Sequence, residues 1–174
     1  MLNKMNPNKQ IQIEKVTLNF GAGKDQKLLE KGVELIKYIT GTNPVKTKAT
    51  KRIPGWGLRP GLPIGCKITI RSKDKVDYVK RFLKAKADIL KRNNFDKHGN
   101  IAFGVHEYID IEGVEYNPDL GLIGLQICVT LKRNGYRIKK RKSLKRSIPK
   151  NHQITQDEAI EFVKKEFNVK VEEK

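Results

Sequence analysis

Negative charge is missing from two long stretches of this sequence. The 174 residues carry 37 Lys and Arg against 19 Asp and Glu, a net charge of +18, yet residues 35–73 and 120–156 contain no acid at all. The acids gather instead in residues 74–119 and 157–173. A lysine-rich surface of the thermophile type would mix acids among its cations throughout. Segregated positive charge instead favours a face that binds a polyanion.

Cysteine is almost absent, and this excludes two kinds of protein. Cys66 and Cys128 are far apart in the chain, and each lies within a strand-like pattern. A disulfide framework needs more cysteines, and a zinc site needs paired Cys or His ligands at short spacing. We therefore expect two buried, reduced thiols, no metal and no cofactor.

Long apolar runs are also missing. The first ten residues, MLNKMNPNKQ, contain no apolar stretch of the kind found in signal peptides. No segment approaches the length of a membrane-spanning helix. We therefore expect a cytoplasmic protein with no membrane partner.

The sequence offers no arrangement typical of catalysis. The three histidines belong to no common sequence pattern; they are His98, His106 and His152. No nucleophile is paired with a base in the sequence. Residues 21–24, GAGK, precede a helical pattern, but a phosphate-binding P-loop has a longer glycine span and a hydroxyl after its lysine. Asp25 follows here. We interpret this segment as a strand-to-helix turn whose amides could approach an RNA phosphate, and we expect no enzyme.

Residues 44–71 read as strand, long loop, strand. Both arms, 44–49 and 66–71, alternate along the chain, which indicates one buried and one solvated face. The side chains expected to face inward are Val45, Thr47, Ala49, Cys66, Ile68 and Ile70. Those expected to face outward are Lys46, Lys48, Lys67, Thr69 and Arg71.

The loop between these arms is rich in proline and glycine and carries the single tryptophan. Loops this long inside a domain are usually functional or disordered. Lys51, Arg52 and Arg59 give it positive charge, and Arg and Trp are good RNA-contacting types. Trp56 has two interpretations: it packs the base of the loop onto the domain, or it stacks on a nucleotide.

The remaining elements follow from periodicity. Alternation predicts strands at residues 16–20, 101–105 and 125–131, and helical spacing predicts helices at 24–39 and 74–89. Thr155 with Glu158 forms a capping box that begins a third helix, to Phe167. We expect a flexible arm at residues 1–10, an RNA-binding α+β domain at 11–150, and a C-terminal helix and tail at 151–174.

These elements predict an α+β fold with a mostly antiparallel sheet, helices packed on one face, and the long loop between two central strands. This sandwich is like that of RNA-recognition domains, whose open sheet faces RNA. The expected open face is polar, positive and free of acids and aromatics, so we expect hydrogen bonds to sugar and phosphate rather than base stacking. Its expected side chains are Thr17, Asn19, Lys46, Lys48, Lys67, Thr69, Arg71, Gln126, Thr130 and Lys132.

A second cationic feature is the run YRIKKRKSLKR at residues 136–146. It contains no acid, and phosphate neutralisation explains it better than a solvated tail. The candidate RNA-phosphate contacts in this run are Arg137, Lys139, Lys140 and Arg141.

Five segments of the chain form a distinctive series: KVTLNFGAG at residues 15–23, ITGTNPVKTKA at 39–49, LRPGLPIGCKITIR at 58–71, FDKHGNIAFGVHEYI at 95–109, and the strand at 124–131. In sequence and in order along the chain, they resemble one family, ribosomal protein L5 of the large subunit, in its archaeal and eukaryotic branch. Together they span most of the chain.

The resemblance implies a non-enzymatic scaffold in the central protuberance, with 5S rRNA, 23S-type rRNA, peptidyl-site tRNA and other large-subunit proteins as partners. Asn19, Thr42 and Thr69 fall where family members contact 5S rRNA, although the family usually has Gln at the position of Thr42. The loop at residues 50–62 would reach the tRNA. An extra-ribosomal RNA-binding or chaperone module is the alternative. The expected 5S rRNA contacts are Thr17, Asn19, Thr42, Lys46, Lys48, Lys67, Thr69 and Arg71, and the expected tRNA contacts are Lys51, Arg52, Trp56 and Arg59.

Overall fold

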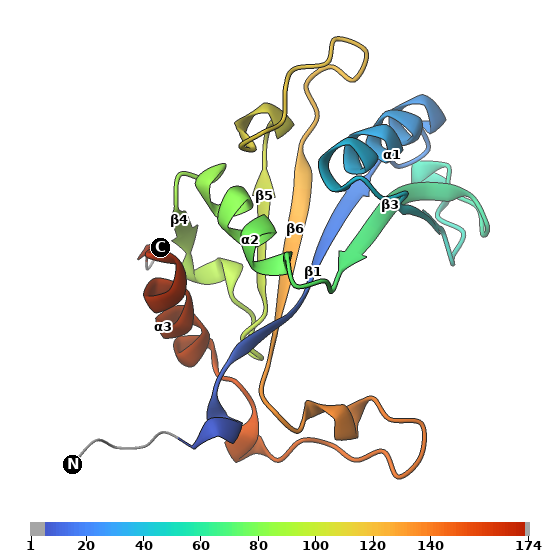
Figure 1. Cartoon of the computed structure of the whole chain (residues 1–174). Helices are drawn as coiled ribbons and strands as arrows, with labels where there is room; N and C mark the ends of the chain where they lie inside the picture. The colour runs from blue at the N-terminus through green and yellow to red at the C-terminus, as the bar shows by residue number, and fades with distance from the viewer. Residues whose placement is uncertain (1–5, 173–174) are drawn as a thin grey trace.

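One five-stranded antiparallel sheet organises the computed structural model, which describes residues 6–172 (Figure 1). The strand order is β2-β3-β1-β6-β5. All four strand pairs in this sheet are antiparallel, which confirms the expected sheet type. The strands are β1 Gln12–Gly21, β2 Val45–Lys48, β3 Pro63–Ile70, β5 Ile101–Val105 and β6 Leu125–Lys132. Residues 1–5 of the expected N-terminal arm lie outside the described residues.

Three helices pack on one face of this sheet: α1 Gln26–Thr40, α2 Lys75–Lys84 and α3 Gln156–Phe167 (Figure 1). Helix α1 begins at Asp25, whose carboxylate accepts hydrogen bonds from two backbone amides of the first turn. It ends at Gly41, whose φ of 67° is the left-handed conformation typical of a helix end. Helix α3 begins at the expected capping box. Local sequence signals therefore place both helices correctly.

Helix α2 ends at Lys84, so our prediction of a helix to residue 89 was wrong. Ala87 and Asp88 have φ values of 55° and 54°, which no α-helix accommodates. The chain then forms β4, Ile89–Lys91, which pairs in parallel with β7, Lys170–Glu172, in a separate two-stranded sheet. Leu90 still reaches the core, but it does so from a strand.

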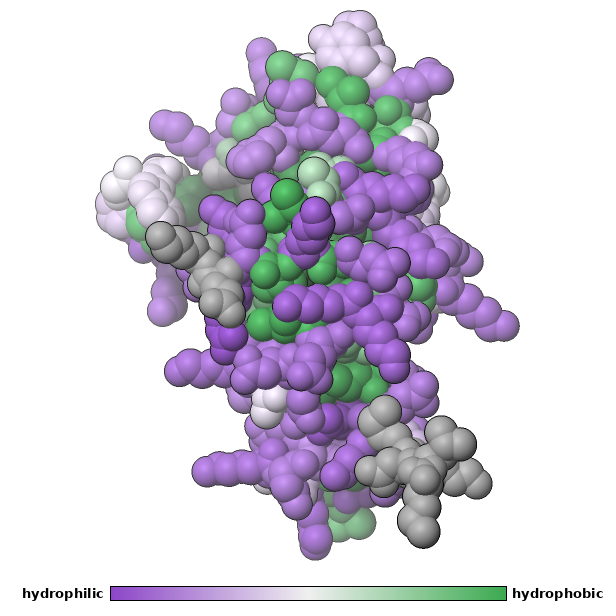
Figure 2. Space-filling model, turned by 90° about the vertical axis from the view of Figure 1, so that its left-hand side faces the viewer, coloured by the Kyte–Doolittle hydropathy of each residue, from purple (hydrophilic) through white to green (hydrophobic). Residues whose placement is uncertain are grey.

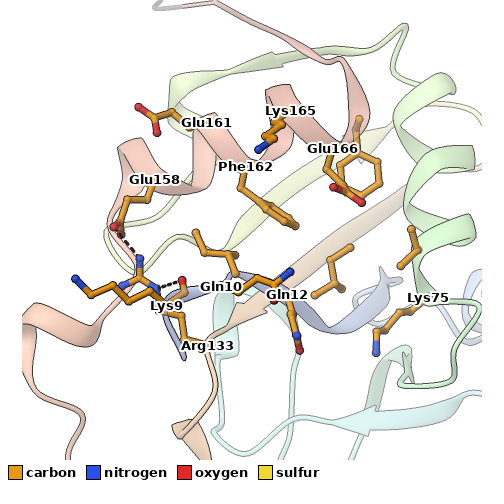
Figure 3. A pocket seen from close by; sticks show the side chains of 14 residues that line it. Lys9, Gln10, Gln12, Lys75, Arg133, Glu158, Glu161, Phe162, Lys165 and Glu166 are labelled. Carbon is orange, nitrogen blue, oxygen red and sulfur yellow. Dashed lines mark hydrogen bonds and ion pairs between the residues drawn. The ribbon is translucent and has the colours of Figure 1, made fainter. Parts of the chain in front are cut away.

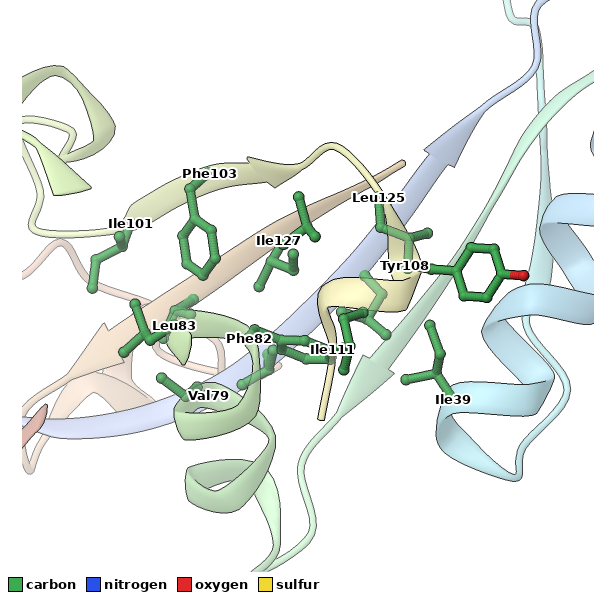
Figure 4. Packing of buried hydrophobic residues seen from close by; sticks show 14 of the residues in the cluster. Ile39, Val79, Phe82, Leu83, Ile101, Phe103, Tyr108, Ile111, Leu125 and Ile127 are labelled. Atoms are coloured by element: carbon green, nitrogen blue, oxygen red, sulfur yellow. The ribbon is translucent and has the colours of Figure 1, made fainter. Parts of the chain in front are cut away.

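The core lies between the sheet and the helices, as Figure 4 shows. Val16 and Leu18 of β1 and Ile127 of β6 point into it and are fully buried. Tyr108, from a short 3-10 turn, packs beside Ile39 of α1 and is also fully buried. Its hydroxyl accepts a hydrogen bond from the Asn117 amide at 2.8 Å, which satisfies the one polar atom of a buried ring.

One glycine allows α1 to lie close to the sheet. A Cβ atom on Gly32 would come within 2.1 Å of the Phe20 ring of β1. No real side chain tolerates that distance, so the close approach of α1 to β1 requires glycine at this position.

Candidate RNA interface

The opposite face of the sheet is open, and its strand register brings four of the expected RNA contacts together. Thr17 pairs with Thr69, and Asn19 pairs with Lys67, across β1 and β3. Directly opposed residues of an antiparallel pair share a face, and their chain neighbours are the core residues. The open face is therefore polar at its centre, as the sequence predicted.

Asn19 is held in a defined orientation on this face. Its Nδ2 donates a hydrogen bond of 3.1 Å to Oε1 of Gln126, which lies opposite it on β6. The amide oxygen of Asn19 is left as an acceptor. Such an acceptor is suited to the 2′-hydroxyl of RNA, which donates a hydrogen bond.

Residues with little or no side chain surround these polar side chains on the open face. Gly21 pairs with Gly65, while Ala102 and Gly104 of β5 lie opposite β6. Along the five strands of the sheet, no open-face position holds an aromatic ring. A low, ring-free surface lets an RNA backbone approach closely. We had interpreted Gly21 as part of a strand-to-helix turn, and its position opposite Gly65 on the open face is a feature that the sequence analysis missed.

The expected orientation of β2 was wrong. This strand lies at the edge of the sheet, so the long loop does not join two central strands. Its register pairs Val45 with Lys67 and Lys46 with Cys66. Val45 therefore lies on the open face, where its side chain is 66% exposed, and Lys46 lies on the helix side. In a strand of four residues, three of them exposed, pairing with β3 decides which face each side chain lies on, and the sequence alternation does not.

The other expected 5S rRNA contacts lie around the edge of this face. Arg71 is exposed just beyond the end of β3, and Lys48 is exposed at a register shift opposite Pro63. Thr42 is outside the sheet, in the turn after α1. Its hydroxyl lies 3.5 Å from the carbonyl oxygen of Thr40, to which it donates.

The loop between β2 and β3 has a defined structure. Ile53 and Leu58 form an isolated β-bridge around the 3-10 turn Pro54–Trp56. Leu58 is buried, whereas the Trp56 side chain is 70% exposed. The interpretation that Trp56 packs the base of the loop onto the domain is therefore wrong. Lys51, Arg52 and Arg59 are exposed on the same loop.

The basic segment, residues 136–146, folds back toward the sheet rather than trailing from it. It starts with the 3-10 turn Tyr136–Lys139, and the Arg146 amide donates a hydrogen bond of 3.2 Å to the Ile138 carbonyl. Lys140 forms an ion pair with Glu14 of β1. Glu14 is an acid at the margin of the open face, so our prediction of an acid-free face holds only for its centre. The other three cations assigned to RNA in this segment are Arg137 and Lys139, which are exposed, and Arg141, which is half-buried.

One buried arginine ties the base of the basic segment to the rest of the protein. Arg133, only 6% exposed, donates to the backbone carbonyls of Lys9 at 3.0 Å and Gln153 at 3.1 Å. Its Nη2 also forms an ion pair of 2.7 Å with Glu158 (Figure 3). Three segments far apart in the chain thus meet at one guanidinium.

A hollow of about 720 Å³ lies beside Arg133 on the helix side. Figure 2 shows that this flank has apolar side chains at its centre and hydrophilic ones around them. Figure 3 shows that lysines and glutamates both line the hollow. Mixed charge of this kind does not favour binding of a polyanion. The open face is therefore the better candidate for an RNA interface.

The cysteines are unpaired, as expected. Burial raises the pKa of the Cys66 thiol to about 11, and nearby Lys46 offsets this only in part. Cys128, on the open face, is half-buried, and burial raises its pKa too. Within residues 6–172, no group of three or more His, Cys, Asp or Glu side chains is placed to hold a metal ion. In the same range, no helix combines the length and apolarity that crossing a bilayer requires.

Comparison with known proteins covers nearly the whole chain. Residues 6–59 match the family described as ribosomal protein L5, and residues 63–162 match the C-terminus of the ribosomal L5 family. The large ribosomal subunit protein uL5 of Sulfolobus acidocaldarius is 42% identical over 168 residues, covering 97% of this chain and 94% of that protein. The uL5 of Methanococcus maripaludis strain C5 is 41% identical over 168 residues, covering 95% and 93%. The uL5 of Sulfurisphaera tokodaii is 38% identical over 170 residues, covering 97% and 96%.

Proposed function

Because the chain belongs to the ribosomal protein L5 family, in its archaeal type, and is a structural constituent of the large subunit of the cytoplasmic ribosome, we propose that its open sheet face binds 5S rRNA. The family implies ribosomal RNA and other large-subunit proteins as its partners. The observation that carries the proposal is the register of β1 with β3, which sets Thr17, Asn19, Lys67 and Thr69 side by side, away from the helices. The role is one of scaffolding, without a chemical reaction.

We expect two kinds of RNA contact on this face. Lys67 and Arg71 neutralise phosphates, and this positions the RNA without reading its sequence. The hydroxyls of Thr17 and Thr69 and the amide oxygen of Asn19 hydrogen-bond to sugar and phosphate edges of a folded RNA. Lys48 and Thr42 extend the contact along the margin, whereas Lys46, on the helix side, contributes only long-range charge.

The affinity for a 5S rRNA transcript is expected to fall steeply with salt. Contacts from Lys48, Lys67 and Arg71 to about three phosphates would release as many counterions, so affinity should drop about 40-fold between roughly 50 and 200 mM salt. Filter binding across a salt series measures this. A drop of less than about tenfold would contradict electrostatic docking.

We propose that the loop between β2 and β3 contacts peptidyl-site tRNA. Exposed Trp56 offers a flat ring on which a base or ribose can stack, beside the cations Lys51, Arg52 and Arg59. The β-bridge between Ile53 and Leu58 supports this use, because it fixes the backbone on either side of Trp56 and leaves the ring exposed.

Replacing Trp56 by alanine together with Arg59→Gln is expected to weaken tRNA binding at the peptidyl site about tenfold, since one stacking contact and one cation are lost. Large subunits reconstituted with the variant would be assayed by tRNA filter binding. Tyr38→Ala, which removes an exposed ring from α1, is the matched control and should change nothing. Loss of 5S rRNA from the variant subunits would show that the loop belongs to the 5S platform instead.

We propose that the basic segment contacts a separate stretch of ribosomal RNA, of the 23S type. Arg137, Lys139 and Arg141 are its main phosphate contacts. Lys140 contributes less, because Glu14 already neutralises it.

A further inference from the structure

A second hollow, of about 620 Å³, lies where the basic segment folds back beside the open face. Strands β1 and β6 form its floor, the turn before β5 forms one wall, and the basic segment with the residues before α3 forms the other. We call it the recess. Its lining includes Lys15, Asn100, Lys139, Lys145, Ile148 and Gln153.

Hydrogen bonds fix the walls of the recess. The Tyr136 hydroxyl accepts from the Ile154 amide at 3.1 Å and donates to the His152 carbonyl at 3.2 Å. The Gln153 side chain donates to the Ile148 carbonyl at 2.9 Å. The recess is thus a preformed feature, the usual condition for a specific binding site.

The charge inside the recess favours an anion. Among residues 6–172, Lys15, Lys139 and Lys145 have no carboxylate within ion-pairing distance. The one acid in the lining, Glu14, is neutralised by Lys140. A small apolar surface from Ile148 and the half-buried Tyr136 lies beside these cations. Positive charge next to a small apolar surface suits a nucleotide, with its phosphate and its flat base.

Two amide side chains supply hydrogen-bond acceptors to the recess. Asn100 uses Nδ2 to donate to Asp96 at 2.7 Å, and Gln153 uses Nε2 to donate to the Ile148 carbonyl at 2.9 Å. These bonds anchor both amides, and the carbonyl oxygen of each amide can accept a hydrogen bond. The exocyclic amino groups of adenine, cytosine and guanine donate such bonds, and uracil has no amino group.

We propose that the recess binds one unpaired ribosomal RNA nucleotide, extruded from its helix, and prefers a base with an exocyclic amino group. The volume lies within the range that holds a single small ligand, and a duplex cannot enter it. Lys139 and Lys145 hold the phosphate, Ile148 and Tyr136 contact the base, and Asn100 and Gln153 accept from its amino group. This inference rests on the proposed function only in taking ribosomal RNA as the ligand.

The test uses the full chain and three labelled RNA hairpins: one with a single bulged adenosine, one with a bulged uridine, and one uninterrupted. The bulged-adenosine hairpin should bind about tenfold more tightly than the uninterrupted one and about threefold more tightly than the bulged-uridine one. The double variant Lys139→Gln with Lys145→Gln should lose the preference for a bulge.

The matched control is Lys142→Gln with Arg146→Gln, which removes the same charge from the same segment outside the recess. It should lower the affinity for all three hairpins alike and keep the preference. An equal preference loss in both variants, or no preference in the unmodified protein, would overturn the recess as a site.

Binding of a 5S rRNA transcript separates the two proposals. If that binding depends on Lys67 and Arg71 while the hairpins show no bulge preference, the recess proposal alone fails. If the bulge preference is present but 5S rRNA does not bind, the proposed use of the open face alone fails.

Discussion

Replacing Lys67 and Arg71 together by glutamate is expected to weaken binding of a 5S rRNA transcript by at least about 100-fold, because two phosphate contacts become two repulsions. Both side chains are exposed, so the fold should not change. Lys67 lies at the centre of the open face beside Asn19, and a carboxylate there faces the RNA backbone directly. Titration of labelled RNA at fixed salt measures the loss, and far-UV circular dichroism monitors the fold.

The matched control reverses two exposed lysines on the helix side, Lys80→Glu with Lys164→Glu. The change in net charge is the same, so any general electrostatic weakening appears in both variants. We expect the control to lose less than about tenfold, because its charges lie on the far side of the sheet. Equal losses in the two variants would mean that net charge, and not the open face, determines binding.

Replacing Arg133 by methionine is expected to lower the free energy of unfolding by about 3 kcal/mol, because buried carbonyl groups lose their donor and Glu158 loses its partner. Urea denaturation at neutral pH measures this. The matched control is Arg137→Met, an exposed arginine of the basic segment, which should stay within about 0.5 kcal/mol. A similar small effect for Arg133→Met would show that the guanidinium does not hold the three segments together.

The loss of stability caused by Arg133→Met should also depend on pH. Burial acts to raise the pKa of the Glu158 carboxyl, but hydrogen bonds from Thr155 and Arg133 outweigh it and hold the pKa below its ordinary value of 4.5. A lowered pKa contributes stability above the unfolded-state value, and the contribution is lost as the pH falls through the folded-state value. The difference in free energy of unfolding between the unmodified protein and Arg133→Met should therefore become smaller as the pH falls below 4.5.

Local patterns in the sequence were sufficient for much of the fold. The strict alternation of β6 and of the second half of β1 predicts both strands, because each has one fully buried face. The ends of α1 follow from Asp25 and Gly41, and the start of α3 follows from its capping box. The polar centre of the open face then follows from the strand alternation alone.

Features that depend on tertiary contacts could not be predicted. The faces of Val45 and Lys46 follow from the pairing of a short edge strand with β3. The end of α2 depends on two residues in the left-handed conformation that carry no glycine signal. The burial of Arg133 depends on carbonyl groups more than 100 positions upstream and about 20 downstream. Likewise, the recess exists only because the basic segment returns to β1.

Photo-crosslinking from the two faces of the sheet tests the central claim most directly. A photoactivatable amino acid would replace Thr69 on the open face in one variant and Lys80 on α2 in another, each bound to 5S rRNA. The account predicts strong crosslinks to the RNA from position 69 and none above background from position 80. Crosslinks from position 80 with none from position 69 would contradict it.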